Sequence, residues 1–379
     1  MKVQILACWF ATSYGAYTNF LRAALEKKIG EVGLLASNCG CGDPAELNRE
    51  FVNDRCEFVE LGQLMYFKDA NPVKAAVRTA VRGALSWERA RRYMARTHGA
   101  EVLHFQQTLN AFGFSVVSSW LNKPTTAKRI VTIHELDPQQ RDFPELNAVY
   151  NRADHLIVLF EEMKQELVRL GLAAERISVV PHGVDIRPIG DAPREGVLFY
   201  GGHFIGKGKG TDALLKAMRI VRTTLGDRTP VLKIHGHWGR TAPADGLRMA
   251  EEAGVADRVV WLNQLNPDET IDAYRRSLVC VMPYQGSSAG LAAVHSMAYG
   301  VPVIATRRAG LPDHLGDVGT WVSENAPEEI AAKLLELLGN EALRGDIAAR
   351  GRARAEREFH WDTIAARTLE IYRKAMEAR

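Results

Sequence analysis

The amino-acid sequence predicts an α/β protein of two similar domains, each built around a parallel β-sheet. The chain has 379 residues and a mass of 42.0 kDa, which is enough for two domains of about 100–200 residues each. Short apolar runs alternate with longer helical patterns almost from end to end, as they do in βαβ units. A polar stretch with Pro188, Gly190 and Pro193 divides this series near residue 190 and is the best candidate for a linker.

The composition is that of an ordinary globular protein. Hydrophobic residues make up 46% of the chain and charged residues 25%. The 48 basic and 45 acidic residues give a net charge of +3, which is too balanced to indicate a nucleic-acid partner. The five cysteines form no CxxC pair, which favours a reducing cytoplasm as the location. No run of about 18 apolar residues occurs, so we expect no membrane-spanning helix.

The candidate strands form two series, one in each half of the chain. In chain order they are 3–7, 32–36, 102–105, 129–133 and 156–159, and then 196–200, 231–235, 259–262, 278–282, 301–305 and 319–322. Ligands of open parallel sheets bind outside the carboxyl ends of the strands. We therefore expect the chemistry in the loops that leave these strands, and a cleft between the halves as the default site.

The first such loop comprises residues 12–17 and precedes a helical pattern that starts near Phe20. Gly15 stands at the mouth of that helix, where backbone amides and the helix dipole favour an anion. A tight strand-to-helix turn that binds no ligand is an equally good interpretation of a single glycine.

The second loop, residues 201–212, follows the strand at 196–200 and contains five glycines in 201–210 together with Lys207 and Lys209. Such a cationic, amide-rich loop before a helix suits a diphosphate. The residues after Gly-Lys do not fit the Walker A pattern. A mobile glycine loop without a ligand is the alternative.

The third loop follows the strand at 278–282 and leads into a helix expected from about 289 to 299. Ser287 and Ser288 can cap that helix and offer hydroxyls beside its open amides. His295 lies about two turns further along and shares a face with both serines.

Several ordered motifs now combine into a resemblance to a known family. They are Ala153-Asp154 before an apolar strand, Pro181-His182-Gly183-Val184-Asp185, Lys209-Gly210-Thr211-Asp212, Tyr299-Gly300-Val301-Pro302, Gly310-Leu311-Pro312-Asp313, and the ending from Phe359-His360-Trp361 to Tyr372. The chain resembles the family 4 retaining glycosyltransferases of the GT-B fold, in which two Rossmann-like domains with parallel sheets face each other across a cleft. The match spans nearly the whole chain.

The resemblance implies that the two domains bind different substrates. Residues 1–187 would form the acceptor-side domain, and residues 188–359 the domain that binds the nucleotide sugar. A helix at about 360–379 would pack back on the first domain. The donor would be a nucleotide-diphosphate sugar such as a UDP-, GDP- or ADP-sugar.

The resemblance also implies roles for individual residues. His134 and Lys209 would be catalytic, with His134 facing the donor sugar and Lys209 the diphosphate. Donor-binding residues would be Gly15, Ala16, Gly202, His203, Lys207, Leu265, Ser287, Ser288, Ala289, Gly290, Leu291 and His295. Acceptor-binding residues would be His104, Gln106 and Gln107.

Two departures from the family pattern stand out. Many relatives carry a Glu-x7-Glu pair in the third loop, whereas this chain has Ser287 and His295 at those positions, which suggests the subgroup that lacks the pair. The arginine usually found early in the diphosphate loop is missing, and His203 lies nearby. These changes bear on the donor and on activity rather than on the fold.

The resemblance implies sugar transfer without a metal, a cofactor or a protein nucleophile. The leaving phosphate would take the proton of the acceptor, while Lys209, Lys207 and two helix N-termini would stabilise the developing charge. One alternative is a GT-B enzyme that forms a bond to sulfur or selenium or acts on phosphate-like acceptors. The other is a catalytically silent protein that binds sugar nucleotides.

One basic segment runs from Lys74 to Arg96, with Lys74, Arg78 and Arg82 spaced four residues apart. That spacing lines one side of a helix and suits peripheral contact with an anionic membrane. A solvated helix is the alternative. We therefore expect a cytoplasmic protein, with the inner membrane face as a second place to find it.

Overall fold

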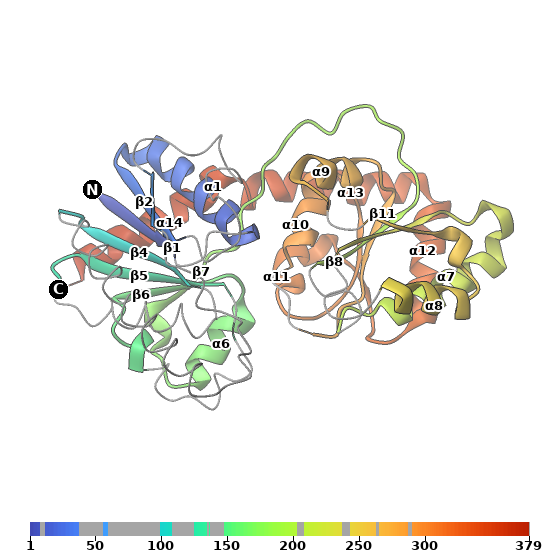
Figure 1. Ribbon diagram of the computed structural model, residues 1–379, viewed down its shortest axis with the longest axis horizontal. Helices are drawn as coiled ribbons and strands as arrows, with labels where there is room; N and C mark the ends of the chain where they lie inside the picture. The colour runs from blue at the N-terminus through green and yellow to red at the C-terminus, as the bar shows by residue number, and fades with distance from the viewer. Residues whose placement is uncertain are drawn as a thin grey trace, which may run out of the picture. The chain divides into compact units, whose positions relative to one another are not determined.

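Figure 1 presents a computed structural model of the chain. The structure describes residues 1–7, 12–37, 56–59, 99–107, 125–134, 136, 148–202, 208–236, 243–262, 265–286 and 290–378. The chain divides into two units, which are described separately. Unit 1 comprises Met1–Gly183 and Trp361–Arg379, and unit 2 comprises Val184–His360.

The division falls before Val184, whereas the sequence placed it after residue 187. The backbone N–H of Val184 donates to the carbonyl oxygen of Phe359 at 2.8 Å, and Val184 forms a parallel bridge with His360. These contacts tie Val184 to the second unit, so the polar stretch around residue 190 lies within unit 2.

Unit 1 is built on a seven-stranded sheet in the order β3-β2-β1-β4-β5-β6-β7. Each neighbouring pair is parallel. The strands are β1 (Val3–Ala7), β2 (Val32–Ser37), β3 (Cys56–Val59), β4 (Val102–Gln107), β5 (Lys128–Ile133), β6 (His155–Val158) and β7 (Ile177–Val179). The strand order reverses direction between β1 and β4, which is where an open α/β sheet binds its ligands.

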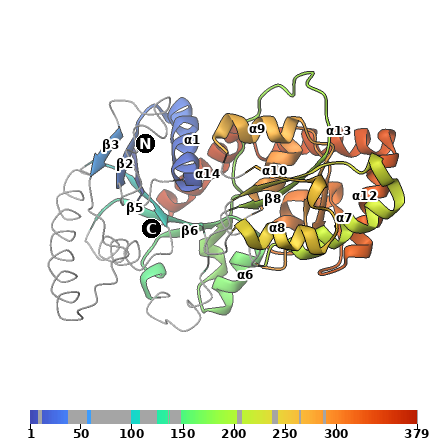
Figure 2. The same cartoon turned by 45° about the vertical axis from the view of Figure 1, so that its right-hand side comes forward.

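Three labelled helices belong to unit 1: α1 (Thr12–Ile29), α6 (Glu161–Arg169) and α14 (Trp361–Glu377). Figures 1 and 2 show α1 and α14 beside each other on one face of the sheet and α6 on the other. Covering both faces explains why the strands are continuous apolar runs. A short 3-10 turn, η3 (Ala174–Arg176), precedes β7.

Helix α1 begins earlier than the sequence suggested. It starts at Thr12, so Gly15 and Ala16 lie in its first turns instead of in a loop that precedes it. The first four backbone N–H groups of a helix have no partner within it. The open amides of α1 therefore lie at and before Tyr14, and the expectation that Gly15 sits at the helix mouth is wrong.

Unit 2 is built on a six-stranded sheet in the order β10-β9-β8-β11-β12-β13, again parallel throughout. The strands are β8 (Val197–Gly202), β9 (Leu232–Gly236), β10 (Val259–Trp261), β11 (Val279–Met282), β12 (Val303–Thr306) and β13 (Thr320–Val322). The order reverses between β8 and β11, so the loops after these two strands meet at the same place.

Helices cover both faces of this second sheet. They are α7 (Thr211–Leu225), α8 (Pro243–Glu252), α9 (Pro267–Arg275), α10 (Leu291–Ala298), α11 (Leu311–Leu315), α12 (Pro327–Gly339) and α13 (Glu341–Glu358), with the 3-10 turns η4 (Gly226–Arg228), η5 (Ala256–Arg258) and η6 (Gly316–Val318). Helices α7 and α12 pack together, as do α10 and α13.

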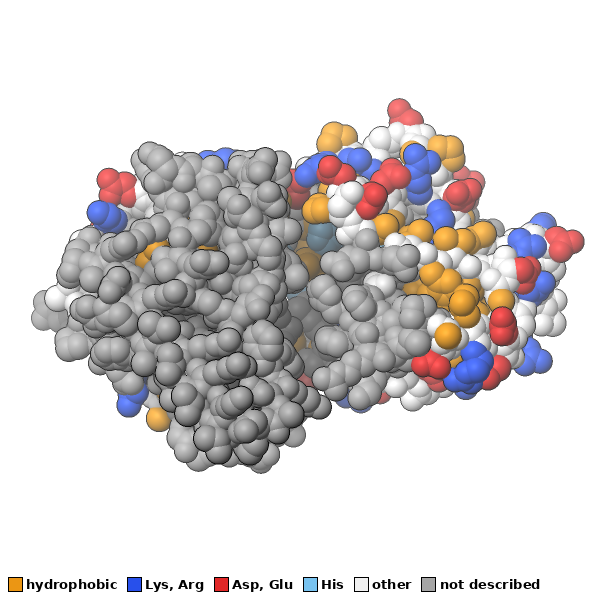
Figure 3. All heavy atoms as spheres, viewed as in Figure 1, with side chains coloured by type: hydrophobic (Ala, Val, Ile, Leu, Met, Phe, Trp, Pro, Cys, Tyr) orange, Lys and Arg blue, Asp and Glu red, His pale blue; other side chains and the backbone are white. Residues whose placement is uncertain are grey.

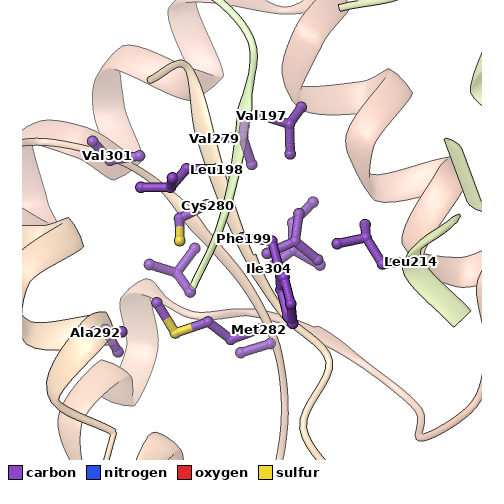
Figure 4. Close-up of a cluster of buried hydrophobic side chains, with 14 of the residues drawn as sticks. Val197, Leu198, Phe199, Leu214, Val279, Cys280, Met282, Ala292, Val301 and Ile304 are labelled. Atoms are coloured by element: carbon purple, nitrogen blue, oxygen red, sulfur yellow. The ribbon is translucent and has the colours of Figure 1, made fainter. Parts of the chain in front are cut away.

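The core of unit 2 lies along the two central strands and the helices on either side. Figure 4 shows Phe199 of β8, Cys280 of β11 and Ile304 of β12 among the buried side chains. All three are 0% exposed. Fully burying one such side chain contributes roughly 1.5–3 kcal/mol, so the ends of β8 and β11 are held by a rigid core.

The loop between β12 and α11 contains an alanine in a left-handed conformation, because Ala309 has a φ of 49°. That conformation costs an L-residue about 1–2 kcal/mol. We expect Ala309→Gly to raise the free energy of unfolding by about 0.5–1 kcal/mol, since glycine removes this strain but gains freedom when unfolded. Urea denaturation measures the change. Ala326→Gly is the matched control, because Ala326 has a φ of −110° and its replacement should destabilise.

The described surface mixes charges of both signs. Figure 3 shows basic and acidic side chains interspersed over the visible face of unit 2. Among the ion pairs of this unit are Arg222 with Asp257 and Arg276 with Asp272. In the parts of the chain that the structure describes, every helix is too short or too polar to cross a bilayer. The basic segment between Lys74 and Arg96 lies outside the described residues.

Candidate functional site

The glycine loop after β8 and the loop after β11 are joined through their backbones. The carbonyl oxygen of Gly208 accepts hydrogen bonds from the N–H groups of Gln285 at 2.8 Å and Gly286 at 3.0 Å. β8 and β11 are adjacent in the sheet, so their carboxyl ends bring the two loops together. Two loops that the sequence singled out separately therefore meet at one place in unit 2.

Gly210 is the point of closest approach between these loops. It is the N-cap of α7 with a φ of 71°, and a Cβ atom built there would lie 2.1 Å from the carbonyl oxygen of Pro283. Only glycine satisfies both the left-handed backbone and the contact. The first residue of the helix, Thr211, is 1% exposed, and its buried hydroxyl has no hydrogen-bond partner among the described residues.

Lys209 holds a positive charge at this junction. Its Nζ lies 4.4 Å from the centroid of the Tyr284 ring, within the range of a cation–π contact. Tyr284 is 2% exposed and follows β11. The ammonium group of one loop is thereby positioned by the aromatic ring of the other. His203 and Lys207, which the sequence placed near it, lie outside the described residues, and Gly202 is the last residue of β8.

The third loop ends at the N-terminus of α10, which begins at Leu291 and has Gly290 as its N-cap with a φ of 70°. Gly290 has no side chain with which to cap this helix, and capping by Ser287 or Ser288 remains a prediction. Ser287, Ser288 and Ala289 lie outside the described residues. A Cβ atom on Gly290 would lie 2.6 Å from Nδ1 of His314 in α11, so the loop after β11 packs closely against this helix. The N-termini of α7 and α10 thus follow adjacent strands.

His295 of α10 is held in an aromatic stack. Its ring lies 5.7 Å from that of Tyr274, with 14° between the planes, and 6.5 Å from that of Tyr299. The hydroxyl of Tyr299 donates to the carbonyl oxygen of Asp185 at 2.9 Å, which fixes one end of the stack. The orientation of His295 is therefore set within unit 2.

The resemblance implies that Leu265 contacts the nucleotide base. Its backbone N–H already makes a hydrogen bond within the protein. That N–H donates to Nε2 of His235 at 3.3 Å. His235 lies in β9 and is 6% exposed, so a buried side chain anchors the segment after β10. The sequence analysis gave His235 no role. Its position near the carboxyl end of a strand could have marked it as a residue close to the candidate site.

In unit 1, His134 follows β5 directly and is 3% exposed. Its Nε2 lies 2.8 Å from Oε1 of Gln106, and its ring meets that of Tyr17 edge-on, with the centroids 4.7 Å apart. The amide of Gln106 in turn lies 3.2 Å from Nε2 of His104. These residues form a continuous polar cluster on one face of β4 and β5.

The resemblance implied acceptor contacts for His104 and Gln106, which lie in and just after the strand expected at 102–105. β4 extends to Gln107 instead, so both residues stand within the strand and are 0% and 2% exposed. They bond to each other and to neighbouring side chains, and their expected role as acceptor contacts remains a prediction. The side chain of Gln107, the last residue of β4, lies outside the described part of the structure.

Three histidines in unit 1 are held in their neutral form by burial. Burial lowers the pKa of His104 to about 3. Burial, together with the charges of His182 and His104, lowers the pKa of His134 to about 3. Burial likewise lowers the pKa of His182 to about 4, against the opposing effect of its hydrogen bond to Gly183.

These pKa values predict sensitivity to acid. A histidine in the unfolded chain has a pKa of about 6.5. As the pH falls from there towards 4, the unfolded chain therefore binds protons that the folded chain does not bind. Each histidine then removes up to about 1.4 kcal/mol of stability per pH unit. Chemical denaturation at pH 7, 6 and 5 measures the slope. His182→Asn should give a shallower slope, and an identical slope would contradict the assignment.

Comparison with known proteins identifies the two halves of the chain. Residues 23–187 match the family described as Glycosyltransferase Family 4, and residues 194–340 match that described as Glycosyl transferases group 1. The D-inositol 3-phosphate glycosyltransferase of Acidothermus cellulolyticus is 32% identical over 265 residues, which cover 64% of this chain and 58% of that protein. The chain thus spans little more than half of that relative.

Solved structures support the fold. The sucrose-phosphate synthase of Thermosynechococcus elongatus superposes over 100% of both chains with a TM-score of 0.74 at 20% identity. The Anabaena protein HepE in complex with UDP superposes over 99% of this chain and 100% of its own, with a TM-score of 0.73 at 14% identity. The two halves of the chain are thus similar to these two glycosyltransferase families, and the fold is that of the two-domain GT-B proteins.

Proposed function

We propose that the protein transfers a sugar from a nucleoside-diphosphate sugar to an acceptor, with retention at the anomeric carbon and without a metal ion. Unit 2 binds the donor and unit 1 the acceptor. One observation carries the proposal. The two loops joined at Gly208 bring Lys209 and the N-termini of α7 and α10 to the carboxyl ends of β8 and β11.

Electrostatics favours a diphosphate at this place. Each helix N-terminus carries the equivalent of about half a positive charge, and Lys209 adds a full one beside Tyr284. The glycine backbones let an anion approach the open amides without steric hindrance. A diphosphate leaving group gains negative charge as the bond to the sugar breaks, and these preorganised positive groups stabilise it at that moment.

The rest of the donor extends from the same loops in our proposal. The stacked ring of His295 contacts the ribose, and the segment anchored at Leu265 contacts the base through its remaining backbone groups, because its N–H is already bound to His235. Ser287, Ser288 and Ala289 complete the sugar and phosphate contacts. The subgroup without the Glu-x7-Glu pair matches Ser287 and His295 in the sequence.

The reaction needs no protein nucleophile. The bond between the anomeric carbon and the diphosphate oxygen breaks, and the acceptor oxygen forms its bond on the same face of the sugar. The acceptor proton passes to the leaving phosphate. Lys209, with Lys207, stabilises the departing charge, and His134 orients the sugar.

The name of the relative suggests where to look for the acceptor. D-inositol 3-phosphate glycosyltransferase implies a phosphorylated polyol as the acceptor of that protein. We propose that a hydroxyl of a related compound is the acceptor here, and inositol 3-phosphate is the first compound to test.

The test is turnover with UDP-, GDP- and ADP-glucose in the presence of EDTA, with and without inositol 3-phosphate. We expect release of nucleoside diphosphate with at least one donor, and NMR coupling constants that show the transferred sugar in the anomeric configuration of the donor. Binding of nucleotide without any turnover would favour the silent sugar-nucleotide binding protein. An inverted product or loss of activity in EDTA would contradict the proposed mechanism.

A further inference from the structure

The buried face of helix α7 is apolar except at its first residue. Its buried side chains are those of Thr211, Ala213, Leu214, Leu215, Ala217, Met218 and Val221. Leu214 packs into the core of unit 2 (Figure 4). Thr211 is 1% exposed, and its hydroxyl has no hydrogen-bond partner in the part of the chain that the structure describes.

This hydroxyl calls for an explanation, because an unpartnered polar group in the interior destabilises the folded chain. A valine would fill nearly the same space beside Ala213 and Leu214 without a polar atom. Packing alone therefore accounts for a β-branched side chain at the start of α7 but not for a hydroxyl there.

The hydroxyl lies at the end of the helix where backbone donors are open. The first hydrogen bond within α7 runs from the N–H of Leu214 to the carbonyl oxygen of Gly210 at 3.0 Å. The N–H groups of the three residues before Leu214 thus have no partner within the helix. The Cα–Cβ bond of a helical residue tilts towards the helix N-terminus, so the side chain of Thr211 extends towards these donors. An oxygen atom bound there would meet backbone N–H groups and the hydroxyl together.

The charges around this helix end favour an anion. The helix dipole is positive here, and Lys209 lies two residues before Thr211 in the chain. The acidic residue of the first turn is Asp212, whose side chain is 51% exposed and pairs with Lys216 one turn further along the helix at 3.9 Å. The acceptor best suited to the Thr211 hydroxyl is therefore an anionic oxygen.

We propose that Thr211 is a donor-binding residue whose hydroxyl donates a hydrogen bond to a phosphate oxygen of the nucleoside diphosphate. This inference deepens the proposed function and rests on it, because it adds a second side chain to the diphosphate contacts of Lys209. The phosphate supplies an acceptor for a hydroxyl that finds none among the described residues. A group that destabilises the protein alone thereby contributes affinity in the complex.

Thr211→Val should change stability and affinity in opposite directions. Without nucleotide, the variant loses an unpartnered hydroxyl, so its melting temperature should rise by about 2–4 °C. With nucleotide, it loses a hydrogen bond to a charged group. The Kd of whichever of UDP, GDP and ADP binds the wild type most tightly should therefore rise about 10–100-fold. A side chain that only packs would give the first effect without the second.

Two further variants control for packing and for the loss of a buried hydroxyl as such. Thr211→Ser keeps the hydroxyl and loses a methyl group, so it should bind the nucleotide nearly as tightly as the wild type. Thr229 lies beyond the other end of α7, is 3% exposed, and donates to the carbonyl oxygen of Gly226 at 2.6 Å. Thr229→Val loses a satisfied hydroxyl, so it should lower the melting temperature and leave the Kd unchanged.

The experiment is calorimetric titration of the wild type and the three variants with UDP, GDP and ADP in EDTA, together with thermal unfolding without nucleotide. Equal Kd values for the wild type and Thr211→Val would overturn the inference and leave the proposed function standing. Binding by Thr211→Ser as weak as that by Thr211→Val would also overturn it, because the hydroxyl would then not be the binding group. A wild type that binds none of the three nucleotides would overturn the proposed function and this inference together.

Discussion

Replacing Gly210 with alanine is expected to abolish productive donor binding. The new Cβ atom would lie 2.1 Å from the carbonyl oxygen of Pro283, and the φ of 71° strains any L-residue. The contact is with backbone, so neither loop can relieve it by rotating a side chain. The two loops must separate, and a displacement of about 1 Å costs a preorganised site about 10²-fold in rate. Initial rates of donor consumption measure the loss.

Gly254→Ala is the matched control for this prediction. Gly254 has a φ of 68° and no heavy atom within 4 Å of the position of a new Cβ. Its replacement therefore introduces the same backbone strain of about 1–2 kcal/mol without a clash. We expect Gly254→Ala to be less stable in urea but normal in rate. If both variants consumed donor at similar rates, the junction at Gly210 would not be part of the donor site.

The second large effect is expected from Lys209→Ala. The ammonium group lies 4.4 Å from the centre of the Tyr284 ring and is the positive side chain at the junction of the two described loops. Losing one preorganised donor to a developing charge lowers kcat by about 10²–10³-fold. We therefore expect a fall of that size, with a smaller change in the affinity for the substrate.

Lys216→Ala controls for the loss of a charge from the same region. Lys216 lies on α7, is 66% exposed and pairs with Asp212 at 3.9 Å. An exposed pair of this kind contributes about 0–1 kcal/mol, so turnover should stay normal. Near-normal turnover in Lys209→Ala would remove this residue from the proposed mechanism.

Much of the fold was predictable because a buried parallel strand is a continuous apolar run. Such runs placed β1 and β11 within a residue of their observed bounds. The sequence analysis missed β3 and β7, which stand at the two edges of their sheet. β7 reads Ile177-Ser178-Val179, an alternating pattern too short to distinguish from a loop.

The site was predictable in its loops but not in its contacts. Lys209 and Gly290 were found from loops that leave strands, yet the chain order does not reveal that β8 lies next to β11. The hydrogen bond between Gly286 and Gly208 forms because these two strands are adjacent in the sheet. In unit 1, His104 is buried within β4, and its partner Tyr372 comes from a helix more than 250 residues later in the sequence.

Calorimetric titration with UDP, GDP and ADP in the presence of EDTA tests the central claim most directly. The loops of unit 2 that meet at Gly210 should bind at least one of these nucleotides in the wild type and in Gly254→Ala, and Gly210→Ala should show no heat of binding. Failure of all three nucleotides to bind the wild type, or equal binding by Gly210→Ala, would contradict a donor site at these loops.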